Sequence, residues 1–459
     1  MVGVGESEQT GNQRILERLN VLIIITDQHN VHALGCYGND AIDTPNLDRL
    51  AAQGIVFDNA ITPSGACRPA KMSIFTGLHP RTHGLLDGRA ETPKGWQTLG
   101  EIFRDAGYRT GLIGKHHMPD AVQTFGFEAL SRGPSPRKGG PESGGRVGPS
   151  RLPNEEHSTG VIATDTMTFI DDHVDEPFFL ISSQFAPHRP IFPSEPWASR
   201  HDPATIAMPP NHDYAAGRLP GPLETLREKS AEMHEGAQAE TLAYYYGLVS
   251  QVDHNIGRLI DRLDHHGLLE KTVILFLSDH GEMMGEHGAW TKDVFGYDAV
   301  VRIPLIWRLP GGEQSGTRRT QLASSLDVMP TLLDLTGLSA EHAMEGRSLV
   351  PEMHDASVAG PEFDVSELFG VHNVRFCSTV RTGRWKYFRI ASPDARDDEY
   401  LFDLAADPWE MRDLSTSPDA RAALDRCRNW LDGWQRETGM CEMARAQLAG
   451  SGFDPDTFA

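Results

Sequence analysis

The run Asn20-Val21-Leu22-Ile23-Ile24-Ile25, followed by Thr26-Asp27-Gln28-His29, decides the fold class of this chain. A continuous apolar run that is rich in β-branched residues predicts a strand whose two faces are both covered. Strands of this kind belong to parallel sheets that carry helices on both sides. Asp27 and Gln28 are therefore expected at the carboxyl end of a buried strand.

Apolar runs of the same kind predict further strands at residues 108–113, 177–185, 272–277 and 303–307. Amphipathic stretches between them predict helices at residues 45–53, 96–106, 237–266 and 326–335. Thr44 is expected to cap the first of these helices, and Gly54 is expected to end it. Strands that alternate with helices in this way predict an α/β fold with a large mixed, mostly parallel sheet sandwiched by helices.

The pattern of the chain changes after about residue 361. Residues 376–390 alternate between apolar and polar side chains as antiparallel strands do, and residues 418–437 predict a helix. We therefore predict three segments. They are a polar N-terminal extension at 1–19, a catalytic α/β domain at 20–360 and a smaller C-terminal α+β subdomain at 361–459.

Composition excludes several classes of function. The chain has 459 residues and a formal net charge of −22, so that binding to nucleic acid is not expected, because phosphates attract basic surfaces. No apolar run is long enough for a membrane span or a signal peptide, so we expect no membrane association and a cytoplasmic location. The five cysteines are scattered and form no Cys-x-x-Cys pair, which predicts neither a zinc site nor a disulfide framework.

The stretch Cys67-Arg68-Pro69-Ala70-Lys71 carries the most information about chemistry. Pro69 suits the first turn of a helix, which is expected to continue to Gly77. Cys67 would then lie at the helix N-terminus, where backbone N–H groups favour an anion. Lys71, one turn later, is expected on the same side of the helix as Cys67.

Polar residues directly follow four of the predicted strands: Asp27, Lys115, His188 and Asp279. Ligands bind at the carboxyl ends of parallel strands, so these residues are expected to converge although they lie far apart in the sequence. Asp27 with Gln28, and Asp279 with His280, supply oxygen donors and one imidazole. This donor set suits a divalent cation.

In this order the motifs resemble those of the formylglycine-dependent sulfatases of the alkaline phosphatase superfamily. The resemblance extends from about residue 20 to about residue 414, and it rests on Asp27-Gln28, Cys67 to Lys71, Thr76-Gly77, Gly114-Lys115-His116-His117, Pro187-His188, Ser278-Asp279-His280-Gly281 and Lys292. It implies an alkaline phosphatase-like fold. It also implies hydrolysis of a sulfate ester, of a small molecule or a sugar, to an alcohol and inorganic sulfate.

The resemblance further implies that Cys67 is oxidised to formylglycine by a formylglycine-generating maturation enzyme and then acts as the nucleophile. Lys71 stands where the family has arginine; it keeps the positive charge but not the planar fork of donors. The implied metal ligands are Asp27, Gln28, Cys67, Asp279 and His280. Calcium is the usual metal of the family, and the nitrogen donor makes manganese an alternative.

The remaining implied catalytic residues are two lysines and two histidines. Lys115 and Lys292 would neutralise the sulfate oxygens and the charge that develops on them. His117 is the candidate base, and either His188 or Lys292 would protonate the departing alcohol oxygen.

Two other readings keep most of these features. In the first, the same fold and nucleophile hydrolyse a phosphonate monoester or a phosphodiester. The segment Gly114-Lys115-His116-His117 favours sulfate, whereas the metal residues are neutral between the two. In the second, Cys67 is not oxidised and the protein is a non-catalytic anion-binding relative.

Residues 131–153 are rich in Gly, Pro, Ser and Arg, and they predict a long loop. Its basic residues are Arg132, Arg137, Lys138, Arg146 and Arg151. Because clustered charges usually face solvent, we favour a solvated loop over contact with an anionic substrate.

Overall fold

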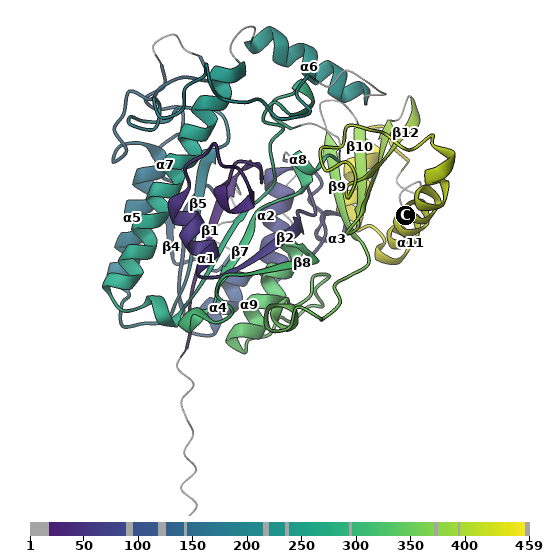
Figure 1. Ribbon diagram of the computed structural model, residues 1–459. Coiled ribbons are helices and arrows are strands. Elements are labelled where there is room, and N and C mark those ends of the chain that lie inside the picture. Colours follow the sequence, from purple (N-terminus) through teal and green to yellow (C-terminus); the bar gives the residue numbers. More distant parts are fainter. Residues whose placement is uncertain are drawn as a thin grey trace, which may run out of the picture.

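The computed structural model describes residues 18–88, 95–117, 125–141, 145–213, 220–234, 238–292, 296–370, 375–392 and 395–454. Residues 1–17 of the predicted N-terminal extension lie outside these ranges. A large mixed sheet and a small antiparallel sheet form the frame of the molecule (Figure 1).

The large sheet has the strand order β4-β3-β5-β1-β6-β7-β2-β8. Only β7 runs antiparallel to its neighbours β6 and β2, and the other pairs are parallel. The predicted mixed, mostly parallel sheet is therefore confirmed. The strands are β1 Asn20–Asp27, β2 Ile55–Ile61, β3 Arg109–Gly114, β4 Ala129–Ser131, β5 Phe178–Pro187, β6 Thr272–Ser278, β7 Leu305–Arg308 and β8 Thr317–Ser324.

Helices cover both faces of this sheet, as the continuous apolar run of β1 predicts. Val21 and Ile23 belong to a core shared with α2 (Cys67–Thr76), α4 (Leu99–Asp105) and α9 (Val328–Thr336). Leu22 and Ile24 point the other way, into a core shared with α1 (Pro45–Ala52), α5 (Ser158–Asp172) and α7 (Gln238–His265). Alternate side chains of one strand thus bind two helical layers to the sheet.

One predicted helix start and one predicted helix cap are corrected. Helix α4 begins later than predicted because Thr98 caps it: its hydroxyl accepts from the N–H of Glu101, and the Glu101 carboxylate accepts from the N–H of Thr98. Thr44 precedes α1, but its side chain does not cap the helix. Asp253 of α7 does so instead, by accepting from the N–H of Leu47 at 2.7 Å. A cap supplied from a distant helix is invisible to a local sequence pattern.

The second sheet is antiparallel throughout, with the order β12-β11-β10-β9. It confirms the antiparallel strands predicted around residues 376–390, and the predicted helix is α11, which packs on its face (Figure 1). The elements of this region are β9 Asp364–Gly370, β10 Arg375–Arg381, β11 Trp385–Ser392, β12 Ala395–Asp403, α11 Arg421–Thr438 and α12 Glu442–Gly450. Shorter helices elsewhere include α3 Pro80–His83, α6 Gly221–His234, α8 Asp298–Val301 and α10 Val350–His354.

None of the helices among the described residues combines the length and the apolar character that crossing a membrane requires.

The parallel neighbours β3, β5, β1 and β6 end at the same edge of the large sheet. Lys115 follows β3, His188 follows β5, Asp27 ends β1 and Asp279 follows β6. The convergence that the sequence predicts for these residues is a direct result of this strand order.

Candidate active site

Asp27 and Asp279 form the centre of a buried cluster, and both side chains are 0% exposed. The Nζ atom of Lys71, one turn into α2, donates to Asp27 Oδ2 at 2.7 Å and also contacts Asp279 Oδ2. The Nζ atom of Lys115 lies 2.8 Å from the same Asp27 oxygen. Two ammonium groups therefore offset the repulsion between two carboxylates that water cannot screen.

Cys67 is the first residue of α2, and its side chain faces this cluster. Its Sγ atom lies 3.7 Å from Asp27 Oδ1, 3.2 Å from His280 Nε2 and 2.9 Å from Lys292 Nζ. The Lys292 Nζ atom also contacts His280 Nε2. The predicted placement of Cys67 at a helix N-terminus is confirmed, so the sulfur meets a helix end, an imidazole and an ammonium group.

A cavity of about 380 Å³ adjoins the cluster at Lys115. The backbone N–H of His188 donates to the Asp27 carbonyl at 3.0 Å, and its ring Nδ1 lies 2.6 Å from the Arg189 carbonyl. His117 is exposed and has a left-handed backbone, with φ of 59°. The lining residues are Gly114, Lys115, His116, His117, Arg132, Ser135, Pro136, Arg137, Phe185, His188, Arg189 and Pro190.

Gln28 reaches the cluster through its backbone as well as its side chain. Its N–H donates to Asp279 Oδ1 at 3.1 Å, and its side-chain Nε2 contacts Glu282 Oε2. The backbone of Gln28 is left-handed, with φ of 62°, and its carbonyl accepts from the Tyr245 hydroxyl at 3.0 Å. The amide nitrogen is thus turned toward Glu282.

Glu282 is a buried member of this site that the sequence analysis did not identify. It is 3% exposed, and its other oxygen, Oε1, contacts the N–H of Thr291, the residue before Lys292. Through these two contacts, Glu282 connects Gln28 with the segment that carries Lys292. The position of Glu282 directly after the motif Asp279-His280-Gly281 could have indicated that it belongs to the site. It was not predicted because a glutamate in a loop is usually exposed.

Charges in the cluster shift the acidity of its members. Burial raises the pKa of Asp27, but Lys115 and Lys71 together outweigh it and hold the pKa well below its ordinary value. Burial and the Asp27 carboxylate raise the pKa of Asp279. Burial and Asp27 also act to raise the pKa of Cys67, yet Lys292 and its cationic neighbours lower it well below the ordinary value. These cationic neighbours therefore favour the thiolate form of the unmodified side chain.

The donor atoms of this cluster fit a divalent cation. One ligand atom each from Asp27, Cys67, Asp279 and His280 lies within 4.8 Å of the others, and all four residues are buried. Carboxylate oxygens are the donors of hard cations, and an imidazole nitrogen widens the choice to transition metals.

The structure brings together most of the residues that the sequence analysis proposed for the site. Asp27, Cys67, Lys71, Lys115, Asp279, His280 and Lys292 share one cluster, and Gln28 borders it. His117 and His188 lie on the adjoining cavity. The roles of these residues stay predictions.

A buried thiol between carboxylates and ammonium groups, at the carboxyl ends of parallel strands, defines a hydrolase site suited to an anionic ester. Residues 19–338 match the family described as Sulfatase, and residues 285–437 match the region described as N-sulphoglucosamine sulphohydrolase, C-terminal. The chain belongs to the sulfatase family and is a sulfuric ester hydrolase.

Similar proteins cover most of the chain. A choline-sulfatase of Rhizobium meliloti is 31% identical, over 87% of this chain and 83% of that protein. An N-acetylglucosamine-6-O-sulfatase of Bacteroides thetaiotaomicron is 26% identical, with the same two coverages. The solved structure of a phosphonate monoester hydrolase of Agrobacterium radiobacter has a TM-score of 0.79 at 23% identity, over 92% of this chain and 96% of that one. This likeness confirms the alkaline phosphatase-like fold.

Proposed function

We propose that this sulfatase hydrolyses the sulfate ester of a small molecule or a sugar with a formylglycine formed from Cys67. Formylglycine supplies, as its hydrate, the hydroxyl nucleophile for this chemistry. The observation that carries the proposal is the position of the Cys67 side chain, with its Sγ atom 2.9 Å from Lys292 Nζ and 3.2 Å from His280 Nε2. A nucleophile at this point lies beside a cation and beside the candidate metal ligands.

Asp27, Asp279, His280 and the side chain at position 67 would hold a divalent cation, with Gln28 as a further candidate ligand. The metal supplies positive charge that polarises the sulfate oxygens. Calcium suits the carboxylate oxygens, whereas His280 makes manganese the alternative.

Lys115 and Lys292 are the proposed sulfate-binding cations. Lys115 lies at the junction of the buried cluster and the cavity, and Lys292 lies beside Cys67. An anionic ester that extends from the cavity to position 67 would lie beside both ammonium groups. This local positive charge matters because the chain as a whole is strongly acidic, with a net charge of −22.

Lys292 and His188 are the two candidates for protonation of the departing alcohol. Burial lowers the pKa of His188, so its imidazole is neutral at neutral pH and suited to accepting a proton. The Nζ atom of Lys292 lies 2.9 Å from Cys67 Sγ, and this position beside the nucleophile favours Lys292 as the acid. His117 is the proposed base for the release of sulfate, because its exposed ring lies on the same cavity.

The names of the relatives support a sulfated small molecule or sugar as the substrate, since they include a choline-sulfatase and an N-acetylglucosamine-6-O-sulfatase. Hydrolysis of a phosphonate monoester or phosphodiester is the second candidate. It is favoured only by the fold shared with a phosphonate monoester hydrolase. Parallel assays of sulfate and phosphate release separate the two, and we expect sulfate release to dominate.

Peptide mass spectrometry of position 67 tests the nucleophile directly. After expression together with a formylglycine-generating enzyme, we expect the mass of formylglycine or its hydrate. An unmodified thiol in fully active protein would refute the proposal. The maturation enzyme as a partner and a cytoplasmic location are parts of the same proposal, and fractionation of the native host tests the location.

A further inference from the structure

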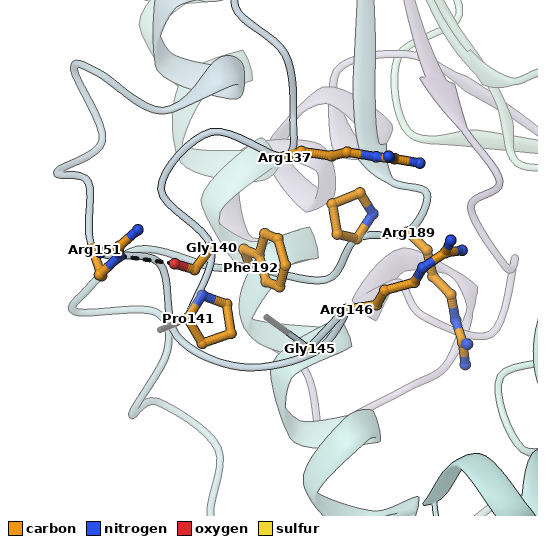
Figure 2. A pocket seen from close by; sticks show the side chains of 9 residues that line it. Arg137, Gly140, Pro141, Gly145, Arg146, Arg151, Arg189 and Phe192 are labelled. Carbon is orange, nitrogen blue, oxygen red and sulfur yellow. Dashed lines mark hydrogen bonds between the residues drawn. The ribbon is translucent and has the colours of Figure 1, made fainter. Parts of the chain in front are cut away.

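A second cavity, of about 440 Å³, adjoins the one at Lys115, and arginines dominate its wall. The two cavities share Arg137, Arg189 and Pro190, so they are continuous around the segment that follows His188. Figure 2 shows the guanidinium groups of Arg137, Arg146 and Arg189 on one side of this cavity. The full lining is Arg137, Gly140, Pro141, Gly145, Arg146, Arg151, Arg189, Pro190 and Phe192.

Backbone hydrogen bonds hold the described part of the loop that carries these arginines beside the segment that follows His188. The N–H of Ile191 donates to the Arg146 carbonyl at 2.8 Å, and the N–H of Gly148 donates to the Ile191 carbonyl at 3.0 Å. The N–H of Ser150 donates to the Pro193 carbonyl at 2.8 Å. Residues 146–150 thus run alongside residues 191–193, a few positions after His188.

A buried amide network fixes the end of the same loop. Asn154 exchanges hydrogen bonds with Asn255 of α7, and Gln251 of α7 donates to both Asn154 and Ser194. These side chains are at most 6% exposed. The loop and the segment after His188 are therefore held to one helix, which fixes the backbone that bears the arginines.

Arg137 and Arg146 give this wall positive charge. No carboxylate of the described residues lies within ion-pair distance of the Arg137 or Arg146 guanidinium group. Arg151 differs, because its Nε donates to the Gly140 carbonyl at 2.8 Å on the opposite side of the cavity (Figure 2). In a chain with a net charge of −22, the guanidinium groups of Arg137 and Arg146 are a local reversal of sign.

We propose that this arginine pocket binds a second anionic group of the substrate, a carboxylate or a further sulfate, while the scissile sulfate lies at Lys115. The inference rests on the proposed function and narrows its substrate class to esters with at least two anionic groups. Guanidinium groups suit this task because they bind carboxylate and sulfate oxygens through paired hydrogen bonds. The proposal assigns the loop that carries these arginines to substrate binding, whereas the sequence favoured a solvated loop.

Calorimetric binding to the full-length Cys67→Ala protein tests the inference without turnover. The ligands are N-acetylglucosamine 6-sulfate, its 3,6-disulfate, and a disaccharide that joins the 6-sulfated sugar to a uronic acid. We expect one or both dianionic ligands to bind about tenfold more tightly than the monosulfate, since a charge-assisted contact contributes on this order. The disulfate and the uronic acid distinguish a sulfate from a carboxylate as the second group.

Arg137→Gln/Arg146→Gln in the same background is expected to remove this tenfold preference. The matched control is Arg49→Gln/Arg421→Gln, which removes the same charge from exposed ion pairs with Asp261 and Asp425 and should keep the preference. Equal affinity for all three ligands, or the same loss in the control, would overturn the inference. Hydrolysis by the matured Cys67 protein is measured separately, so a failure of the proposed function is recognised independently of this result.

Discussion

Two buried ion clusters of similar composition differ in what surrounds them. The cluster at the sheet edge joins Asp27 and Asp279 to Lys71 and Lys115. The second lies between α8 and the small sheet. There Lys386 Nζ contacts Asp298 Oδ1 and lies 3.6 Å from Glu410, and Arg381 lies 3.3 Å from the same aspartate.

Each cluster combines two carboxylates with two cations, and every one of these residues is at most 7% exposed. In the first, Cys67 Sγ and His280 Nε2 each lie 3.7 Å from an aspartate oxygen, and its member Lys115 lines the cavity described above. The second cluster links elements far apart in the sequence, since Asp298 and Lys386 are 88 residues apart. Buried charge alone therefore does not mark an active site; a nucleophile and access to ligand do.

Cys67→Ala gives the largest expected effect. Loss of the nucleophile should lower turnover by roughly 10⁴-fold or more, because no other group in the cluster can replace it. Sulfate release from the folded variant measures this. Cys427→Ala removes another buried thiol, in α11, and should leave turnover unchanged. Comparable activity in both variants would contradict the assignment of Cys67.

Asp279→Asn tests which cluster holds the metal. The change keeps the shape of the side chain but removes a candidate ligand charge, so metal affinity should fall at least roughly 100-fold. Metal content after dialysis, measured by mass spectrometry, reports this. Asp298→Asn removes a carboxylate of the second cluster, and metal content should then be retained. Retention of metal by Asp279→Asn would show that the cation lies elsewhere.

Lys386→Met should unfold the protein more easily without changing its chemistry. Removal of one partner leaves Asp298 buried with less compensation, which should cost about 3–5 kcal/mol in free energy of unfolding. Urea denaturation measures the loss, and turnover per folded molecule should match that of the parent. A fall in turnover at unchanged stability would assign this cluster a catalytic role.

Glu410 gives the smallest expected effect, through pH. Burial raises the pKa of Glu410 from 4.5 to about 8, against the opposing effect of Lys386. The folded protein then holds this proton more tightly than the unfolded chain. The free energy of unfolding should therefore fall as the pH rises from 4.5 to about 8.

Denaturation of Glu410→Gln across the same pH range isolates this contribution. The amide keeps an acceptor for the N–H of Asp298 but does not titrate in this range. The stability of the parent relative to the variant should fall as the pH rises. A constant difference would show that Glu410 is ionised throughout.

The sequence predicted the parts of the fold that have a strong local pattern. The strand Asn20–Asp27 and the helix Gln238–His265 have long, regular apolar patterns. The helix Ser158–Asp172 was missed because it is rich in threonine and β-branched residues, and its apolar stripe is weak. Strands Ile55–Ile61 and Thr317–Ser324 contain polar residues and lack a continuous apolar run, so their pairing with each other and the pairing of the first with β7 define them better than a local pattern does.

The residues of the site also divide into those that could be predicted from the sequence and those that could not. The motif around Cys67 and the strand ends that carry Asp27 and Asp279 were predictable, because chain order and strand position determine them. The placement of Lys71 between the two carboxylates was not predicted, since a helical position fixes only the side of the helix. Glu282 was missed because its partner Gln28 is 254 residues away in the sequence.

The distance in sequence between Cys67 and its partners also defines an interval of time. Cys67 is synthesised 213 residues before His280, and at about 5–20 residues per second this takes roughly 10–40 s. For almost all of this interval strand β6 has not been synthesised, and the thiol is not yet enclosed. Once the chain has folded, Cys67 is 8% exposed and closed to another enzyme. The proposed conversion to formylglycine therefore has to be completed before the folding chain encloses position 67.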